Sequence, residues 1–213
     1  TIMHIKTFSI PLPPKPSSTT QPSAHLTVYL LDTLSCKPDK LLPAILICPG
    51  GGYCRVSDRE KEPVAMQFLS AGCHAMTLEY SVAPSRFPNA LTELAASVAL
   101  IRSHANEWMI DPDKIIVAGF SAGGHLACYL GAFWNKDSLF TPLGLTADQI
   151  RPNGLILSYP VITSGTDCHS GSFENLLGED AHDKTARDSV SLELHVGSHT
   201  PKTFLWHTWT DTS

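Results

Sequence analysis

The sequence lacks the features that would take a protein into a membrane or onto a nucleic acid. No apolar run approaches the roughly 20 residues that a helix needs to cross a bilayer. With 15 Lys and Arg against 20 Asp and Glu, the formal charge is −5 and the pI is about 6.0, which gives no electrostatic case for a polyanionic partner. The first residues show no charged-then-apolar signal pattern. We therefore expect a cytoplasmic protein whose partner is a small molecule, and neither a nucleic acid nor a membrane.

The cysteines and histidines likewise lack the spacing of a disulfide scaffold or a metal site. The six cysteines are scattered without a C-x-x-C pair: Cys36, Cys48, Cys54, Cys73, Cys128 and Cys168. We interpret them as reduced thiols, with a catalytic or redox cysteine as the alternative. His195 and His199 are four residues apart, but no H-E-x-x-H glutamate accompanies them. This spacing gives no signal for a metal site, and the serine chemistry predicted below needs no organic cofactor.

The composition favours a single folded domain over residues 1–213. The chain is 43% hydrophobic and 16% charged, which suits a globular protein with a substantial core. Short apolar stretches alternate with stretches of helical spacing along most of its length. Strands are expected at 25–31, 44–48, 73–78, 115–118, 155–157 and 204–206, and helices at 62–71, from 88 towards 108, and at 123–133. This alternation predicts an α/β fold with a mainly parallel sheet and helices on both faces.

Two segments depart from the alternation. Residues 11–22 contain five prolines among serines and threonines, which favours an extended loop at the edge of the sheet. Residues 163–200 are polar and rich in Gly, Ser, Asp and His, so loops and short helices are expected there. Neither segment has the character of a domain boundary.

The strongest chemical signal is the segment Gly119-Phe120-Ser121-Ala122-Gly123-Gly124, which matches G-x-S-x-G. In this motif a serine occupies a sharp turn between a strand and a helix, with its hydroxyl exposed above the sheet. The context agrees, because an apolar strand precedes the motif and a helical pattern follows it. So short a motif also arises by chance, but the flanks favour Ser121 as a nucleophile.

A glycine turn upstream supplies the second signal. Pro49-Gly50-Gly51-Gly52-Tyr53 directly follows an apolar strand. Ester cleavage builds a tetrahedral oxyanion that needs backbone N–H donors already in place, and consecutive glycines let the backbone approach the substrate. We predict the N–H groups of Gly51, Gly52 and Ala122 as an oxyanion hole. An ordinary glycine turn is the alternative; a phosphate loop is disfavoured because no G-K-[ST] follows.

The chain resembles the esterase and lipase family of the α/β-hydrolase fold, in the acetyl-esterase and acetylxylan-esterase-like branch, some members of which are called xylanases. Five segments carry the resemblance: 49–53 (H-G-G-G-like, with Pro49 in place of the histidine), 80–84 (Y-R-L-A-P-like), 111–127 (the block around the serine), 176–178 and 204–208. It extends from about residue 42 to the last residue. The resemblance implies hydrolysis of short-chain esters, in particular acetyl esters, with a sugar or xylo-oligosaccharide as the alcohol.

The resemblance also assigns the catalytic acid. The family pattern W-H-T-x-x-D places Asp211 just beyond the strand at 204–207, where it would orient a histidine and offset its charge. The catalytic histidine of the family follows the acid, and no residue of this sequence corresponds to it. His125 and His207 are poorly placed by chain order. We therefore expect the native chain to extend past Ser213, the C-terminal strand and helix of the sheet to be missing here, and residues 1–213 alone to be nearly inactive.

Three other functions remain open at this point. A peptidase or amidase would use the same fold and nucleophile, and a non-catalytic binding protein would retain the fold alone. A glycoside hydrolase would need a pair of carboxylates across a sugar-binding cleft. Tyr53 and Tyr159 are placed either to line the site or to pack in the core.

Overall fold

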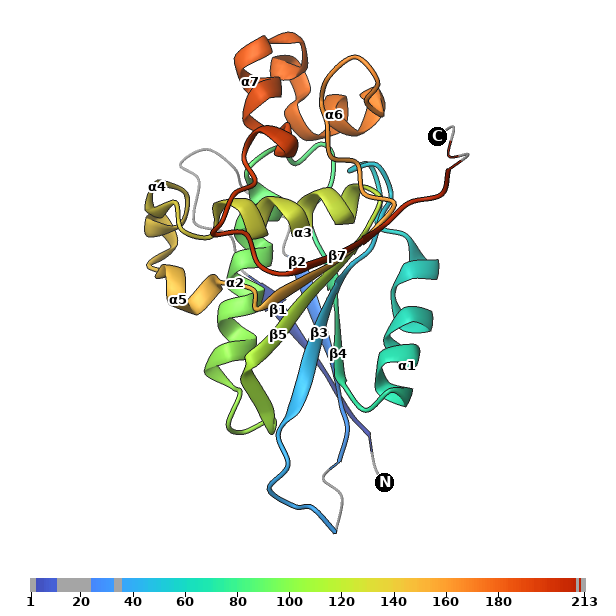
Figure 1. Ribbon diagram of the computed structural model, residues 1–213, viewed down its shortest axis with the longest axis vertical. Helices are drawn as coiled ribbons and strands as arrows, with labels where there is room; N and C mark the ends of the chain where they lie inside the picture. The colour runs from blue at the N-terminus through green and yellow to red at the C-terminus, as the bar shows by residue number, and fades with distance from the viewer. Residues whose placement is uncertain (1–2, 11–23, 33–35, 210, 212–213) are drawn as a thin grey trace.

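The computed structural model describes residues 3–10, 24–32, 36–209 and 211, and within them the chain forms a seven-stranded sheet (Figure 1). The strands are β1 (His4–Ile10), β2 (Ala24–Leu30), β3 (Leu42–Cys48), β4 (His74–Glu79), β5 (Ile110–Phe120), β6 (Gly154–Ser158) and β7 (Thr203–Trp206). Their order across the sheet is β1-β2-β4-β3-β5-β6-β7. The neighbours β1 and β2, and β2 and β4, pair antiparallel. The remaining neighbours in this order, from β4 across β3, β5 and β6 to β7, pair parallel.

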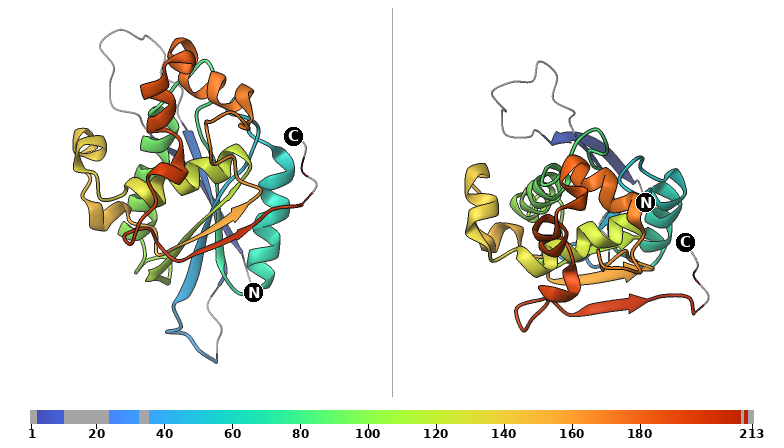
Figure 2. Two further views of the ribbon diagram at one scale, coloured as in Figure 1. Left: turned by 45° about the horizontal axis from the view of Figure 1, so that its top comes forward. Right: turned by 90° about the horizontal axis from the view of Figure 1, so that it is seen from above.

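Helices cover both faces of the sheet. They are α1 (Glu62–Ser70), α2 (Asn89–Ser103), α3 (Ala122–Phe133), α4 (Asp137–Phe140), α5 (Ala147–Ile150), α6 (Ser170–Leu177) and α7 (Lys184–Ser189), with short 3-10 turns η1 (Asp58–Glu60), η2 (Thr141–Leu143), η3 (Gly178–His182) and η4 (Leu192–Leu194). Figures 1 and 2 show α1 on one face, α2 and α3 on the other, and α6 and α7 beyond the carboxyl ends of the parallel strands. No helix in the described part of the chain is long and apolar enough to cross a bilayer.

Apolar spacing explains how the helices pack. On α2, residues three and four apart turn to the sheet and are buried: Leu91, Leu94, Ala95, Val98 and Ile101. On the opposite face, Ala65 and Leu69 of α1 pack against Ile45 and Ile47 of β3. Each large apolar side chain that is fully buried contributes roughly 1.5–3 kcal/mol, so these two layers fix the sheet against its helices.

The predicted α/β architecture, a mainly parallel sheet with helices on both faces, is confirmed, with local differences. Strand β1 was not expected, because a strand with an exposed face at a sheet edge carries little apolar signal. Helix α2 ends at Ser103, short of the expected limit near Trp108. Strand β5 begins at Ile110, earlier than the apolar run at 115–118. The expected proline-rich loop at 11–22 lies outside the described residues.

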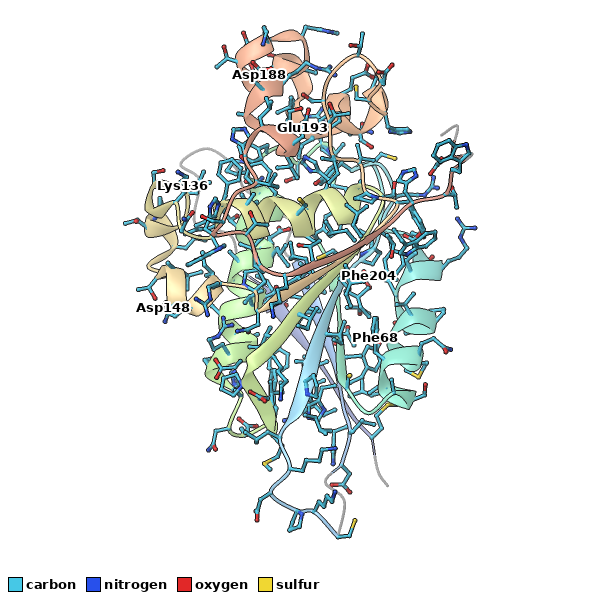
Figure 3. All side chains as sticks on the ribbon, viewed as in Figure 1. Phe68, Lys136, Asp148, Asp188, Glu193 and Phe204 are labelled. Atoms are coloured by element: carbon cyan, nitrogen blue, oxygen red, sulfur yellow. The ribbon has the colours of Figure 1, made fainter. Side chains whose placement is uncertain are left out.

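Strand β7 forms the last strand of the described sheet, and its four residues are exposed. Phe204 pairs with Ile156 of β6 and is 62% exposed, on the face that α1 covers further along the sheet. Figure 3 labels Phe204 on this strand and Phe68 on α1. The apolar layer on the α1 face is thus complete over β3 and β4 and open over β7.

Candidate active site

Ser121 occupies the turn between β5 and α3, as the motif predicts. Its backbone has φ 52° and ψ −119°, a left-handed φ that non-glycine residues rarely adopt. The Ser121 N–H donates to the carbonyl of Ser158 at 3.0 Å, and the Val161 N–H donates to the carbonyl of Ser121 at 3.1 Å. Strand β6 and the residues after it therefore hold the strained turn. Within the described residues, the Ser121 hydroxyl has no side-chain partner.

The spacing of the motif has a steric cause. A methyl group built on Gly119 would lie 2.2 Å from the carbonyl oxygen of Gly123. One built on Gly123 would lie 2.1 Å from the carbonyl oxygen of Cys48, at the end of β3. Both contacts are to backbone atoms, so no side-chain movement relieves them. Strand, turn and helix pass this close only when glycine occupies the positions two before and two after Ser121.

The glycine turn after β3 lies directly against Ser121. A methyl group built on Gly50 would come within 3.1 Å of the Ser121 Cβ. The Tyr80 hydroxyl donates to the carbonyl of Pro49 at 2.6 Å, and the Asn175 side-chain amide donates to the carbonyl of Gly52 at 2.9 Å. Side chains from two other parts of the fold thus fix the carbonyl groups at both ends of this turn.

The predicted oxyanion donors have no protein acceptor. Among the described residues, the backbone N–H groups of Gly51, Gly52 and Ala122 make no hydrogen bond. Ala122 is also the first residue of α3, where the N-terminal end of the helix carries partial positive charge. Two donors without an acceptor in the described chain thus lie on the turn that approaches Ser121 through Gly50, and a third directly follows Ser121 at the start of a helix. Such donors are suited to stabilising an anionic oxygen.

Asp211 lies beyond the carboxyl end of β7. Register pairs Phe120 with Ser158, and Ser158 with Trp206, so the ends of β5, β6 and β7 meet at one edge of the sheet. The Asp211 carboxylate is 3.6 Å from the Nε2 atom of His207. Its assignment as the catalytic acid remains a prediction from the family pattern.

His125, the histidine that follows the motif, fits a structural role. His125 is buried, with Nδ1 2.8 Å from the Tyr53 hydroxyl and Nε2 donating to the carbonyl of Val190 at 2.8 Å. Because a carbonyl can only accept, Nε2 carries the hydrogen and Nδ1 accepts from Tyr53. Burial lowers the pKa of His125 to about 4. With both ring nitrogens engaged, His125 is not poised to take a proton from Ser121.

His195 and His199 do not form a metal pair. The Nε2 atoms of His195 and His199 lie 2.8 Å and 2.7 Å from the carbonyls of Asp188 and Ala132. No group of three or more His, Cys, Asp or Glu side chains within the described ranges is arranged to hold a metal ion. All six cysteines fall in those ranges, and all six are free thiols.

Comparison with known proteins agrees with this geometry. Residues 31–213 match BD-FAE, which is most of the chain. The chain belongs to the BD-FAE family. It is 37% identical over 175 residues to endo-1,4-beta-xylanase B of Butyrivibrio fibrisolvens, covering 78% of this chain and 27% of that protein. It is 30% identical over 163 residues to the acetylxylan esterase of Xylanibacter ruminicola, covering 73% of this chain and 31% of that protein. The chain thus spans less than a third of the length of these two relatives.

Solved structures place this BD-FAE chain in the α/β-hydrolase fold. The crystal structure of an acetyl ester-xyloside bifunctional hydrolase from Caldicellulosiruptor lactoaceticus superimposes with a TM-score of 0.80 at 38% identity, over 96% of this chain and 72% of that one. The carboxylesterase Cest-2923 of Lactobacillus plantarum gives 0.80 at 28% identity, over 99% and 74%. The predicted family and fold are both confirmed.

Sequence reasoning missed several residues that shape the BD-FAE site. Asn175 and Tyr80 support the glycine turn, yet neither belongs to a motif for hydrogen bonding. Of the two tyrosines left open, Tyr53 is buried in the core against His125. Tyr159 follows β6 and donates its hydroxyl to Glu60 at 3.1 Å. Glu60 itself lies close enough to the glycine turn to bond Gly50, and no sequence signal indicated it.

A buried carboxyl lies beneath this region. Glu93 of α2 has no exposed surface, and its Oε2 atom accepts the Ser81 N–H at 2.7 Å. Burial raises the pKa of Glu93 to about 7. The native protein therefore holds a proton on Glu93 between about pH 4.5 and 7 that the unfolded chain has lost. Stability from this group is present at acid pH and decreases as the pH rises through that range.

Replacing Glu93 with Gln should remove this decrease. The unfolding free energy of Glu93→Gln minus that of wild type should rise by about 3 kcal/mol between pH 4.5 and 8. The reason is that the amide is neutral at every pH, whereas the wild-type carboxyl must ionise in the core as the pH rises. Urea unfolding across this pH range measures the difference. Glu174→Gln, at an exposed position on α6, is the control and should show no such trend. If the difference in unfolding free energy between Glu93→Gln and wild type does not change with pH, the raised pKa of Glu93 is contradicted.

Proposed function

We propose that this protein hydrolyses short-chain carboxylic esters through an acyl-enzyme on Ser121. The observation that carries the proposal is the strained turn at Ser121 beside backbone donors that no group in the described part of the chain satisfies. Hydrolysis of an ester passes through a tetrahedral oxyanion, and unpaired N–H groups fixed before reaction stabilise that charge without reorganisation. Membership in the BD-FAE family supports the same chemistry.

The proposed reaction has two steps. The Ser121 oxygen attacks the ester carbonyl while a histidine takes its proton, and the oxyanion is bound by the N–H groups of Gly51, Gly52 and Ala122. The C–O bond then breaks, and the histidine returns the proton to the departing alcohol. Water, deprotonated by the same histidine, then attacks the acyl-enzyme. The bond between the acyl carbon and the Ser121 oxygen breaks, the histidine returns the proton to that oxygen, and the acid is released. Asp211 would hold the imidazole in the required tautomer. No metal or organic cofactor takes part in these steps.

The preferred ester is proposed from the relatives. Their names describe an acetylxylan esterase and an acetyl ester-xyloside hydrolase. We therefore propose an acetyl group as the acyl part and a sugar or xylo-oligosaccharide as the alcohol. Esters of longer acids should be cleaved more slowly.

A substrate panel separates this proposal from the alternatives. The full-length protein should cleave p-nitrophenyl acetate and leave aminoacyl anilides and p-nitrophenyl xyloside intact. Faster cleavage of the anilides would indicate a peptidase or amidase, and release from the xyloside would indicate glycoside hydrolysis. A fluorophosphonate should label the protein on Ser121, because it reacts with activated serines. Failure of both labelling and acetate cleavage would favour a non-catalytic protein.

A further inference from the structure

The glycine turn is attached through its first amide to a carboxylate from another element. Glu60, at the end of η1, accepts the Gly50 N–H with its Oε2 atom at 2.7 Å. Its other oxygen, Oε1, accepts the Tyr159 hydroxyl at 3.1 Å. Both carboxylate oxygens are thus bonded, one to the oxyanion turn and one to the segment that follows β6.

The two partners of Glu60 both border the nucleophile. A methyl group built on Gly50 would lie 2.9 Å from Glu60 Oε2 and 3.1 Å from Ser121 Cβ, so the carboxylate and the nucleophile flank the same α-carbon. Tyr159 directly follows Ser158, whose carbonyl accepts the Ser121 N–H. Tyr159 has a left-handed φ of 37°. Glu60 therefore connects the turn that carries the oxyanion donors to the backbone that holds Ser121.

We infer that Glu60 is a positioning residue that sets the direction of the oxyanion donors. The Gly50 N–H is bonded to the carboxylate, whereas the N–H groups of Gly51 and Gly52 have no acceptor among the described residues and are left for the oxyanion. Hydrogen bonds to a charged acceptor are shorter and stronger than neutral ones. This inference rests on the proposed ester hydrolysis at Ser121.

The Tyr159 side chain acts on Glu60 as a hydrogen-bond donor. Burial, followed by the nearby Glu60, raises the pKa of Tyr159 to about 12. The Tyr159 O–H therefore keeps its proton at neutral pH and donates to Glu60, whose other oxygen accepts the Gly50 N–H. Asn175, which donates to the carbonyl of Gly52, restrains the other end of the turn.

Removing the carboxylate should impair catalysis more than binding. Glu60→Ala should lower kcat for p-nitrophenyl acetate by roughly 30- to 100-fold, somewhat less than the loss of a whole oxyanion donor. KM should change little. Affinity for a trifluoromethyl ketone, which adds to the serine and places an oxyanion in the same hole, should fall by the same factor as kcat/KM. A merely structural role would lower the melting temperature without this parallel loss.

Conservative variants test the geometry. Glu60→Gln keeps an oxygen for Gly50 and can donate its amide to Tyr159, so kcat should return to within about 3-fold of wild type. Tyr159→Phe leaves the carboxylate unsupported and should cost roughly 3- to 10-fold. Asp58→Ala is the matched control, because Asp58 belongs to the same 3-10 turn, is exposed and pairs with Lys61 instead. It should leave kcat unchanged.

The outcomes separate this inference from the proposed function. Rescue by Glu60→Gln, with Asp58→Ala unaffected, supports Glu60 as a positioning residue. Wild-type kcat in Glu60→Ala, or equal losses in the Ala and Gln variants, would overturn it while leaving Ser121 as the nucleophile. If Glu60→Ala does not fold, the Gln and Tyr159→Phe variants still decide the matter. Undiminished activity in Ser121→Ala would instead overturn the ester-hydrolysis mechanism itself.

Discussion

Replacing Ser121 with Ala should abolish ester hydrolysis while the fold persists. The variant keeps the oxyanion donors but loses the atom that forms the acyl-enzyme, so kcat should fall by roughly 10⁴- to 10⁶-fold. The Ser121 hydroxyl has no side-chain partner within the described chain, so its removal breaks no hydrogen bond of the fold. Initial rates with p-nitrophenyl acetate, beside thermal unfolding, give both quantities.

Ser70→Ala provides the comparison for this variant, because Ser70 is exposed at the end of α1. It should retain full activity. Residual hydrolysis of more than about a tenth of the wild-type rate in Ser121→Ala would mean that another group carries the reaction. The same result would leave the fold assignment intact, since the fold is established by the sheet order and the structural relatives.

The second large effect is expected at Gly51. Its φ is 132°, and a methyl group built there would lie 2.2 Å from the carbonyl oxygen of Arg55 and 3.0 Å from the Arg55 Cγ. Because the nearest contact is to backbone, Gly51→Ala must displace the turn. Losing alignment of the Gly51 and Gly52 donors should lower kcat by about 10³-fold, since one oxyanion donor alone is worth roughly 10²- to 10³-fold.

Gly72→Ala is a matched control for the backbone strain. Gly72 also has a left-handed φ, 84°, but a methyl group there meets nothing within 4 Å. It should cost about 1 kcal/mol of stability and no activity. Measuring kcat and unfolding free energy for both variants separates strain from the loss of donors. Near-wild-type kcat in a folded Gly51→Ala protein would exclude the proposed oxyanion turn.

The nucleophile turn could be predicted from sequence because its requirements are local. Strand, serine and helix are consecutive, and the close approach of Gly119 and Gly123 to neighbouring backbone demands glycine at fixed spacing. The same holds for the glycine turn, whose residues directly follow β3. Each of these features is encoded within about ten residues, so periodicity and motif together define it.

The supports of the site could not be predicted in the same way. Asn175 reaches the glycine turn from 123 residues away along the chain. Glu60 is only 10 residues from Gly50, but its second bond, to Tyr159, spans 99. Such contacts depend on how elements meet after folding, and a single glutamate in a polar loop resembles any solvated residue. Strand β1 could not be predicted from the sequence either, because most of its residues are exposed and carry no regular apolar pattern.

The central claim, that Ser121 forms an acyl-enzyme, is tested most directly by trapping that intermediate. Full-length protein mixed with p-nitrophenyl acetate, quenched rapidly in acid and digested, should yield one acetylated peptide containing Gly119-Phe120-Ser121-Ala122-Gly123. Fragmentation should place the acetyl group on the Ser121 oxygen. An acetyl group on a different residue, or turnover without any acetylated peptide, would contradict the account.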